Sequence, residues 1–187
     1  MKTKLILFAL IAMITTDFSL NAQTTPAQGK KILIAYYSLR NGNTRLVAEE
    51  IQKNVGGDIF RIETTHGYPS EYRAVTEQAR RELDTGFRPP LKANMKNFSQ
   101  YDIVFIGSPN WWGTIAPTVM TFLESNDFKG KTIVPFITHE GSRLGRSAAD
   151  IAKLAPGATL LNGLPVRGSS AANCAADVKN WTFLSFK

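Results

Sequence analysis

The sequence predicts one α/β domain: a doubly wound, five-stranded parallel sheet with helices on both faces. Five apolar runs of strand length alternate with segments in which apolar residues recur at helical spacing. The runs are almost uninterrupted by polar residues, which is typical of parallel strands covered on both faces. A length of 187 residues suits a single domain. Strands that alternate with helices therefore favour one parallel sheet with right-handed crossovers.

The first strand–helix unit begins at the apolar run 32–37. A turn rich in Gly, Asn and Ser follows, and then Val47, Ile51 and Val55 recur at a spacing of four, so they share one face of a helix. Gly56-Gly57 ends that helix.

The second unit begins with an expected strand at 58–63. Ser70 is a suitable N-cap for the next helix, and Pro89-Pro90 prevents its continuation. The apolar residues expected to share the inner face of this helix are Tyr72, Val75, Ala79 and Leu83.

The third strand is expected at 103–106, followed by a turn at 108–113 and a helix with Pro117 in its first turn. The fourth is expected at 132–137. Because Pro135 has no N–H to donate, we expect a bulge or an unpaired position there. The remaining expected elements are a helix at 148–155, a strand at 159–166 and a helix at 171–186.

The first 22 residues are typical of a secretory signal peptide. Lys2 and Lys4 precede a ten-residue apolar run at 5–14, and a polar stretch leads to Ala22. A short membrane anchor or a buried strand is the alternative. No Cys follows the run and no Arg pair precedes it, which favours export of an unfolded chain. We therefore expect a signal peptide at 1–22, a linker at 23–30, a domain at 31–187 and an exported, periplasmic protein without stable membrane insertion after cleavage.

The composition, with 43% hydrophobic and 20% charged residues, is that of a globular protein rather than a disordered one. The 22 basic residues exceed the 15 acidic ones. They are dispersed along the chain, which favours a solvated surface over nucleic-acid binding. Cys174 is the single cysteine, so it forms no intramolecular disulfide and belongs to no metal motif. No metal site is expected.

Residues 38–44, directly after the first strand, are suited to phosphate binding. Hydroxyls, side-chain amides and turn backbone can hydrogen-bond a phosphate, and the dipole of the following helix favours an anion. The loop lacks the spacing of a triphosphate or dinucleotide loop. A monophosphate is therefore favoured, and a plain polar turn is the alternative. The expected binding residues are Ser38, Arg40, Asn41, Gly42, Asn43 and Thr44.

Tyr36-Tyr37-Ser38 followed by Gly42-Asn43-Thr44 resembles the loop of flavodoxins that binds the phosphate of flavin mononucleotide (FMN). The family usually has one residue fewer between the positions of Ser38 and Gly42. Either the loop bulges around Arg40-Asn41, or Ser38 is displaced from the phosphate.

Two further strand-end loops carry the same resemblance, which implies that they contact the flavin ring. In the second loop, residues 108–113, an indole can stack on the ring, and we expect one Trp to flank the flavin while the other packs beneath the loop. In the third loop, residues 138–145, His139 could hydrogen-bond the flavin or a partner; a simple loop histidine is the alternative. His66 is interpreted as structural or exposed. The implied binding residues are Pro109, Asn110, Trp111, Trp112 and Gly113 of the second loop and Thr138, His139, Glu140, Gly141 and Ser142 of the third.

The resemblance covers residues 31–187 and implies non-covalent FMN binding and electron transfer, with redox proteins or small molecules as donor and acceptor. No catalytic residue is identified. One alternative is an NAD(P)H-dependent quinone or small-molecule reductase. Another is a binding module that kept the fold and lost the flavin.

Overall fold

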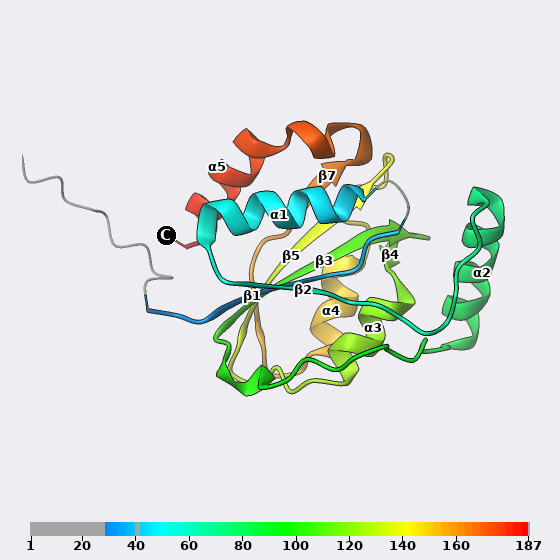
Figure 1. The fold of residues 1–187 in the computed structure, drawn as a ribbon, viewed down its shortest axis with the longest axis horizontal. Helices are drawn as coiled ribbons and strands as arrows, with labels where there is room; N and C mark the ends of the chain where they lie inside the picture. Colours follow the sequence, from blue (N-terminus) through cyan, green and yellow to red (C-terminus); the bar gives the residue numbers. More distant parts are fainter. Residues whose placement is uncertain (1–28, 40–41, 187) are drawn as a thin grey trace, which may run out of the picture.

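A computed structural model describes residues 29–39 and 42–186, so the predicted signal peptide lies outside the described residues. The chain forms a sheet in the order β2-β1-β3-β5-β6, with every neighbouring pair in that order parallel (Figure 1). β7 continues the edge beyond β6 by pairing with β5, and β4 forms a short hairpin with β3. The strands are β1 (Ile32–Tyr36), β2 (Asp58–Arg61), β3 (Ile103–Trp111), β4 (Thr114–Ile115), β5 (Thr132–His139), β6 (Thr159–Leu160) and β7 (Leu164–Arg167).

Helices cover both faces of the sheet, as predicted. α1 and α5 lie on one face and α3 and α4 on the other, while α2 stands at the edge of the molecule (Figure 1). The helices are α1 (Asn43–Val55), α2 (Tyr72–Thr85), α3 (Pro117–Glu124), α4 (Ser147–Leu154) and α5 (Ala175–Ser185), with 3₁₀ turns η1 (Phe98–Gln100) and η2 (Gly168–Asn173). Among the described residues, none of these helices has the length and apolarity needed to cross a membrane.

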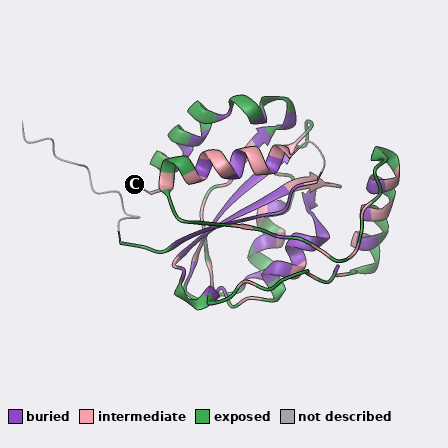
Figure 2. Ribbon diagram, in the orientation of Figure 1, coloured by how far each residue is buried: buried purple, intermediate pink, exposed green. Residues whose placement is uncertain are grey.

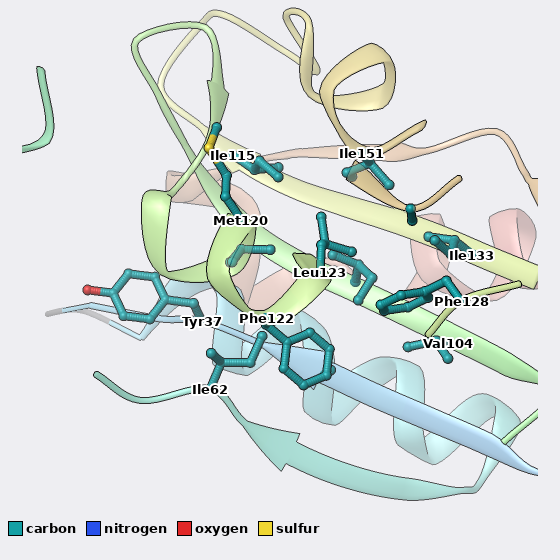
Figure 3. Packing of buried hydrophobic residues seen from close by; sticks show 14 of the residues in the cluster. Tyr37, Ile62, Val104, Ile115, Met120, Phe122, Leu123, Phe128, Ile133 and Ile151 are labelled. Atoms are coloured by element: carbon teal, nitrogen blue, oxygen red, sulfur yellow. The ribbon is translucent and has the colours of Figure 1, made fainter. Parts of the chain in front are cut away.

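The two faces of the sheet bury separate cores. Leu33 and Ala35 of β1 pack in the cluster that includes α3 and α4, whereas Ile34 and Tyr36 pack in the cluster that includes α1 and α5. This alternation follows from the two-residue period of a strand. The central strands are buried along most of their length (Figure 2), and Figure 3 shows aromatic and aliphatic side chains filling the first cluster.

Pro135 lies in a gap at the edge of β5. β6 pairs with residues 132 and 133 and β7 with residues 136–139, so neither pairs with position 135. The carbonyl oxygens of Lys131 and Ile133 accept hydrogen bonds from the β6 segment, and Pro135, two residues further, faces the same edge. Gly163 lies against it, because an added Cβ there would be 3.1 Å from Pro135 Cγ. On its other side Pro135 stays in register with Ile106 of β3. The unpaired position expected at Pro135 is therefore confirmed only toward β6 and β7, and β5 continues through it.

Three expected elements differ from the structure by more than a shift of one or two residues at an end. β3 continues to Trp111, so the turn expected at 108–113 is wrong: those residues begin as strand, and only Trp112-Gly113 form the turn of the β3–β4 hairpin. The strand expected at 159–166 is two short strands, because the chain leaves the sheet opposite Pro135. The final helix expected at 171–186 is η2 followed by α5.

The start of α2 also differs from the expectation. Its N-cap is Glu71 rather than Ser70, and among the described residues no side chain caps it. Val75 and Ala79 face inward as predicted, but Tyr72 is 70% exposed. The prediction of Ser70 as the N-cap is wrong, because the helix begins at Tyr72 and the residue before it is Glu71. The inner face therefore begins one turn later than the periodicity indicated.

Candidate functional site

A cavity of about 670 Å³ lies at the carboxyl ends of β1, β3 and β5, where the strand order changes direction. Ligands of doubly wound sheets bind at such a crevice. Segments from all three strand ends and from α2 meet there. The described lining consists of Leu39, Asn43, Thr44, Tyr72, Val75, Thr76, Pro109, Asn110, Trp111, Trp112, Gly113, Thr138, His139, Glu140, Gly141 and Ser142.

The first turn of α1 borders the cavity. Gly42 is the N-cap in a left-handed conformation (φ 73°), and it has no side chain with which to cap the helix. Asn43 and Thr44 line the cavity. The hydroxyls of Thr44 and Thr138 are buried and hydrogen-bonded to each other at 2.8 Å. Backbone N–H groups without helical partners and the helix dipole make this end of the cavity suitable for an anion.

The other four residues predicted to bind in the first loop are not part of the described cavity lining. Arg40 and Asn41 lie outside the described residues. Ser38 is buried, and its Oγ lies 3.4 Å from the backbone nitrogen of Arg45, from which it accepts a hydrogen bond. Ser38 and Gly42 are chain neighbours of the lining residues Leu39 and Asn43 but do not themselves belong to the described lining.

The β3–β4 hairpin forms the second wall. Trp112 (φ 54°) and Gly113 (φ 83°) both have positive φ, as a two-residue type I′ turn requires. Asn110 fixes the turn from inside, because its Oδ1 accepts the Gly113 N–H and its Nδ2 donates to the carbonyl of Arg143, both at 2.9 Å. The same side chain therefore holds the second and third loops together.

The two adjacent tryptophans have different surroundings. Trp111 is half-buried, and its ring centroid lies 5.1 Å from that of Tyr68 and 5.7 Å from that of Tyr37. Trp112 is 49% exposed. Its Nε1 donates to the carbonyl of Thr76 on α2 at 2.8 Å, and the Arg80 guanidinium lies 5.2 Å from its ring centroid. Both indoles line the cavity; which of them flanks a flavin remains a prediction.

The third loop closes against the hairpin. The N–H of Arg146 donates to the carbonyl of Gly113 at 2.8 Å. Gly145 has φ 54°, and an added Cβ would lie 2.9 Å from the carbonyl carbon of Gly113. Only glycine permits this approach, so the second and third loops form one connected rim.

His139 lies at the end of β5 in the cavity wall. Burial, reinforced by the positive charge of Arg143, lowers the pKa of its imidazole, and Glu140 partly offsets this. Its Nδ1 accepts the N–H of Gly141 at 2.9 Å. A protonated ring would lose that acceptor, so the geometry also favours the neutral form.

Helix α2 supplies lining residues that the sequence reasoning missed. Val75 and Thr76 follow Tyr72 by three and four residues, so both lie on the same side of the helix as Tyr72, and all three line the cavity. Leu39, after β1, was also missed. The spacing on α2 was visible in the sequence, but it was interpreted as a core-facing stripe.

Charge in the described lining is limited to Glu140, with titratable His139 beside it. The rest is aromatic, aliphatic or uncharged polar. No group of three or more His, Cys, Asp or Glu suited to a metal occurs within residues 29–39 and 42–186. This donor set is suited to an organic ligand that has an anionic end at α1 and a flat ring near the tryptophans.

The strand order, the cavity at the β1/β3 switch and the helix N-terminus beside it define a doubly wound protein of the kind that binds a mononucleotide at its strand ends. The Flavodoxin family model matches residues 31–183. The chain therefore belongs to the flavodoxin family.

Solved structures agree with this membership. A candidate flavoprotein from Bacteroides eggerthii is 32% identical, with 80% of this chain and 98% of that chain covered and a TM-score of 0.67. One from Bacteroides uniformis is 28% identical, with 83% and 99% covered and a TM-score of 0.72. A flavoprotein from Lactobacillus acidophilus, solved in complex with FMN, is 23% identical, with 79% and 99% covered and a TM-score of 0.62. None of the curated proteins compared with the chain matches it.

Proposed function

We propose that this protein binds FMN non-covalently in the strand-end cavity and transfers electrons through it. The observation that carries the proposal is that the N-terminus of α1 and an aromatic wall border one cavity. The Lactobacillus acidophilus flavoprotein, which shares the fold, is described in complex with FMN. When bound, FMN supplies reversible electron-transfer chemistry.

The residues at the N-terminus of α1 are suited to hold the phosphate of the cofactor. Backbone N–H groups of the first turn and the hydroxyl of Thr44 would donate to its oxygens. Because Thr44 has a single hydroxyl proton, Thr138 would then donate to Thr44 Oγ1 and so fix its rotamer. A phosphate on a helix terminus is also favoured by the dipole.

The rim residues are suited to hold the flavin ring. Trp111 and Trp112 offer indole faces, and the connected second and third loops present backbone groups to the ring edge. The neutral His139 at the end of β5 can hydrogen-bond the ring or a partner. In this arrangement the rim would limit water access and orient the ring.

An electron carrier is the function we favour, and an NAD(P)H-dependent quinone or small-molecule reductase is the alternative, since a bound flavin can receive hydride without a separate dinucleotide site. The protein would receive electrons from one partner and pass them to another, and each partner is a redox protein or a small molecule. The basic excess of the chain differs from the acidic balance of typical flavodoxins, so its partners are expected to differ in charge from theirs.

The test is a fluorescence titration of the purified protein with FMN and riboflavin. We expect one FMN per chain, bound more tightly than riboflavin. Thr44→Val removes the hydroxyl at similar volume and should cost about 1.5–3 kcal/mol of FMN binding, the scale of a hydrogen bond to a charged group. Riboflavin binding should be unaffected, which makes it the internal control. Absence of quenching by either flavin would exclude the cofactor, and steady NAD(P)H oxidation by the loaded protein would favour the reductase.

We further propose that the chain is exported and acts in the periplasm, with residues 1–22 removed. This rests on the two lysines and the apolar run of the predicted signal peptide. A chain exported unfolded would capture FMN outside the cytoplasm. Fractionation with N-terminal sequencing of the soluble protein should find a periplasmic chain that begins near Gln23. An intact Met1 on a cytoplasmic protein would exclude export.

A further inference from the structure

Glu82 is a buried carboxylate on α2 for which the proposed function gives no role. It is 5% exposed. Tyr68 OH donates to its Oε2 at 2.6 Å, Gln78 Nε2 donates to its Oε1 at 2.8 Å, and His66 Nε2 lies 3.2 Å from Oε1. A buried carboxylate is costly without such partners. Both oxygens are occupied, so the network holds its members in one geometry.

Tyr68 carries this geometry toward the cavity. Its ring meets Trp111 at 66° with centroids 5.1 Å apart, and Tyr37 lies 6.1 Å from Tyr68 and 5.7 Å from Trp111. The three rings therefore support one another, with Trp111 as the member that lines the cavity. Neither Glu82 nor Tyr68 belongs to the described lining.

The hydrogen bond to Glu82 sets the orientation of the Tyr68 ring. Burial, together with the hydrogen bond to Glu82, raises the pKa of the Tyr68 hydroxyl, so Tyr68 remains a donor. A hydrogen bond to a carboxylate is short and directional. Gln78 Nε2 also donates to the carbonyl of Gly67 at 3.1 Å, which ties the loop before α2 to the same cluster.

We propose that Glu82 is a positioning residue that acts through Tyr68 to fix the indole of Trp111, and thereby the flavin-facing wall of the cavity. This inference rests on the proposed FMN function. Glu82 touches no ligand in it: the carboxylate orients Tyr68, and Tyr68 and Tyr37 orient Trp111. Loss of the carboxylate or of the Tyr68 hydroxyl should leave the fold intact and loosen the indole.

The experiment compares Tyr68→Phe, Glu82→Gln and the double variant in the full chain. Glu77→Gln is the matched control, because Glu77 lies on the same helix but is exposed and paired with Arg73. FMN affinity is measured by quenching and the environment of the flavin by visible circular dichroism. We expect each single change to weaken FMN binding by about 2- to 30-fold and to alter the dichroism. The double variant should be no worse than the more damaging single one, since in this proposal the Tyr68 hydroxyl acts only through its hydrogen bond to Glu82.

Wild-type affinity and dichroism in Tyr68→Phe would overturn the proposal, as would additive losses in the double variant. Tyr68→Phe keeps the ring, so it is informative even if Glu82→Gln does not fold. If the wild-type protein binds no FMN, the proposed function fails. Tryptophan emission of the ligand-free protein then decides the inference: a shift in Tyr68→Phe but not in Glu77→Gln supports it, and unchanged emission contradicts it.

Discussion

Trp111 and Trp112 are neighbours in sequence with separate physical roles, and their substitution should separate two kinds of loss. Trp111 is half-buried against two tyrosines. Replacing a fully buried tryptophan by alanine costs about 3–5 kcal/mol of folding free energy, so Trp111→Ala should destabilise the fold by less, on the order of 2 kcal/mol. It should also weaken FMN binding. Urea unfolding of the ligand-free protein measures the first effect, and titration measures the second.

Trp112→Ala should leave stability closer to wild type, because half of that side chain is exposed. Its effect on FMN binding should be about 1–3 kcal/mol, the range for stacking of a nucleic-acid base on an aromatic side chain. Unchanged affinity and absorption bands in both variants would mean that the tryptophans serve only the fold.

His139 should make stability depend on pH. Its pKa is lowered in the folded chain by burial and by Arg143, from about 6.5 in the unfolded chain. The unfolded chain therefore binds a proton first as the pH falls. The contribution of His139 to stability is complete above about pH 6.5 and is lost as the pH falls through the lower folded value.

His139→Gln should remove that dependence. Urea midpoints of the wild type and the variant are measured at pH 7.5 and 5.5. Between these two pH values the midpoint of the wild type should fall more than that of the variant. An equal change of the urea midpoint with pH in the two proteins would show that the pKa of His139 is the same in the folded and the unfolded chain.

At the scale of elements, the joint between the hairpin and the third loop is the most demanding contact in the site. Gly145→Ala would place a methyl group on the carbonyl of Gly113 and require a left-handed alanine. It should destabilise the protein by about 1–3 kcal/mol and weaken FMN binding. Gly67→Ala is the control, since an added Cβ there meets nothing within 4 Å. Thermal unfolding of both variants gives the comparison, and equal melting temperatures would contradict a rigid joint.

Strand-end loops could be predicted from the sequence because their position follows from the apolar runs that precede them. Asn43, Trp111 and His139 each come directly after or near the end of such a run, and a parallel sheet brings these ends together. The local motifs then predict which end of the cavity suits a phosphate and which suits a ring.

The α2 wall could not be predicted in the same way. Thr76 reaches the cavity only because α2 stands beside the hairpin, a relation between segments far apart in the sequence. Glu82 was missed for a related reason, since a glutamate on a surface helix is normally solvated. Its burial depends on Tyr68 and His66, which lie in a loop without strong periodicity.

For the whole molecule, FMN should act as a structural component. The cavity joins α1, α2 and the ends of three strands, so a ligand that binds the folded state alone stabilises all of them. FMN at 100 times its dissociation constant should add about 2.7 kcal/mol. At 2–4 °C per kcal/mol for a chain of this size, the melting temperature should rise by about 5–11 °C. Differential scanning calorimetry with and without FMN tests this, with riboflavin expected to give a smaller rise.

Pro135 and Gly163 have a consequence for how the sequence can change over time. The proline lacks the N–H that an adjoining strand would need, and the glycine gives its ring room at the place where the edge of the sheet divides into β6 and β7. Each residue makes the other acceptable, so the two positions should vary together among relatives. Where position 135 is not proline, a continuous last strand and a larger residue at 163 become accessible; where it is proline, the interruption of that strand is inherited with it.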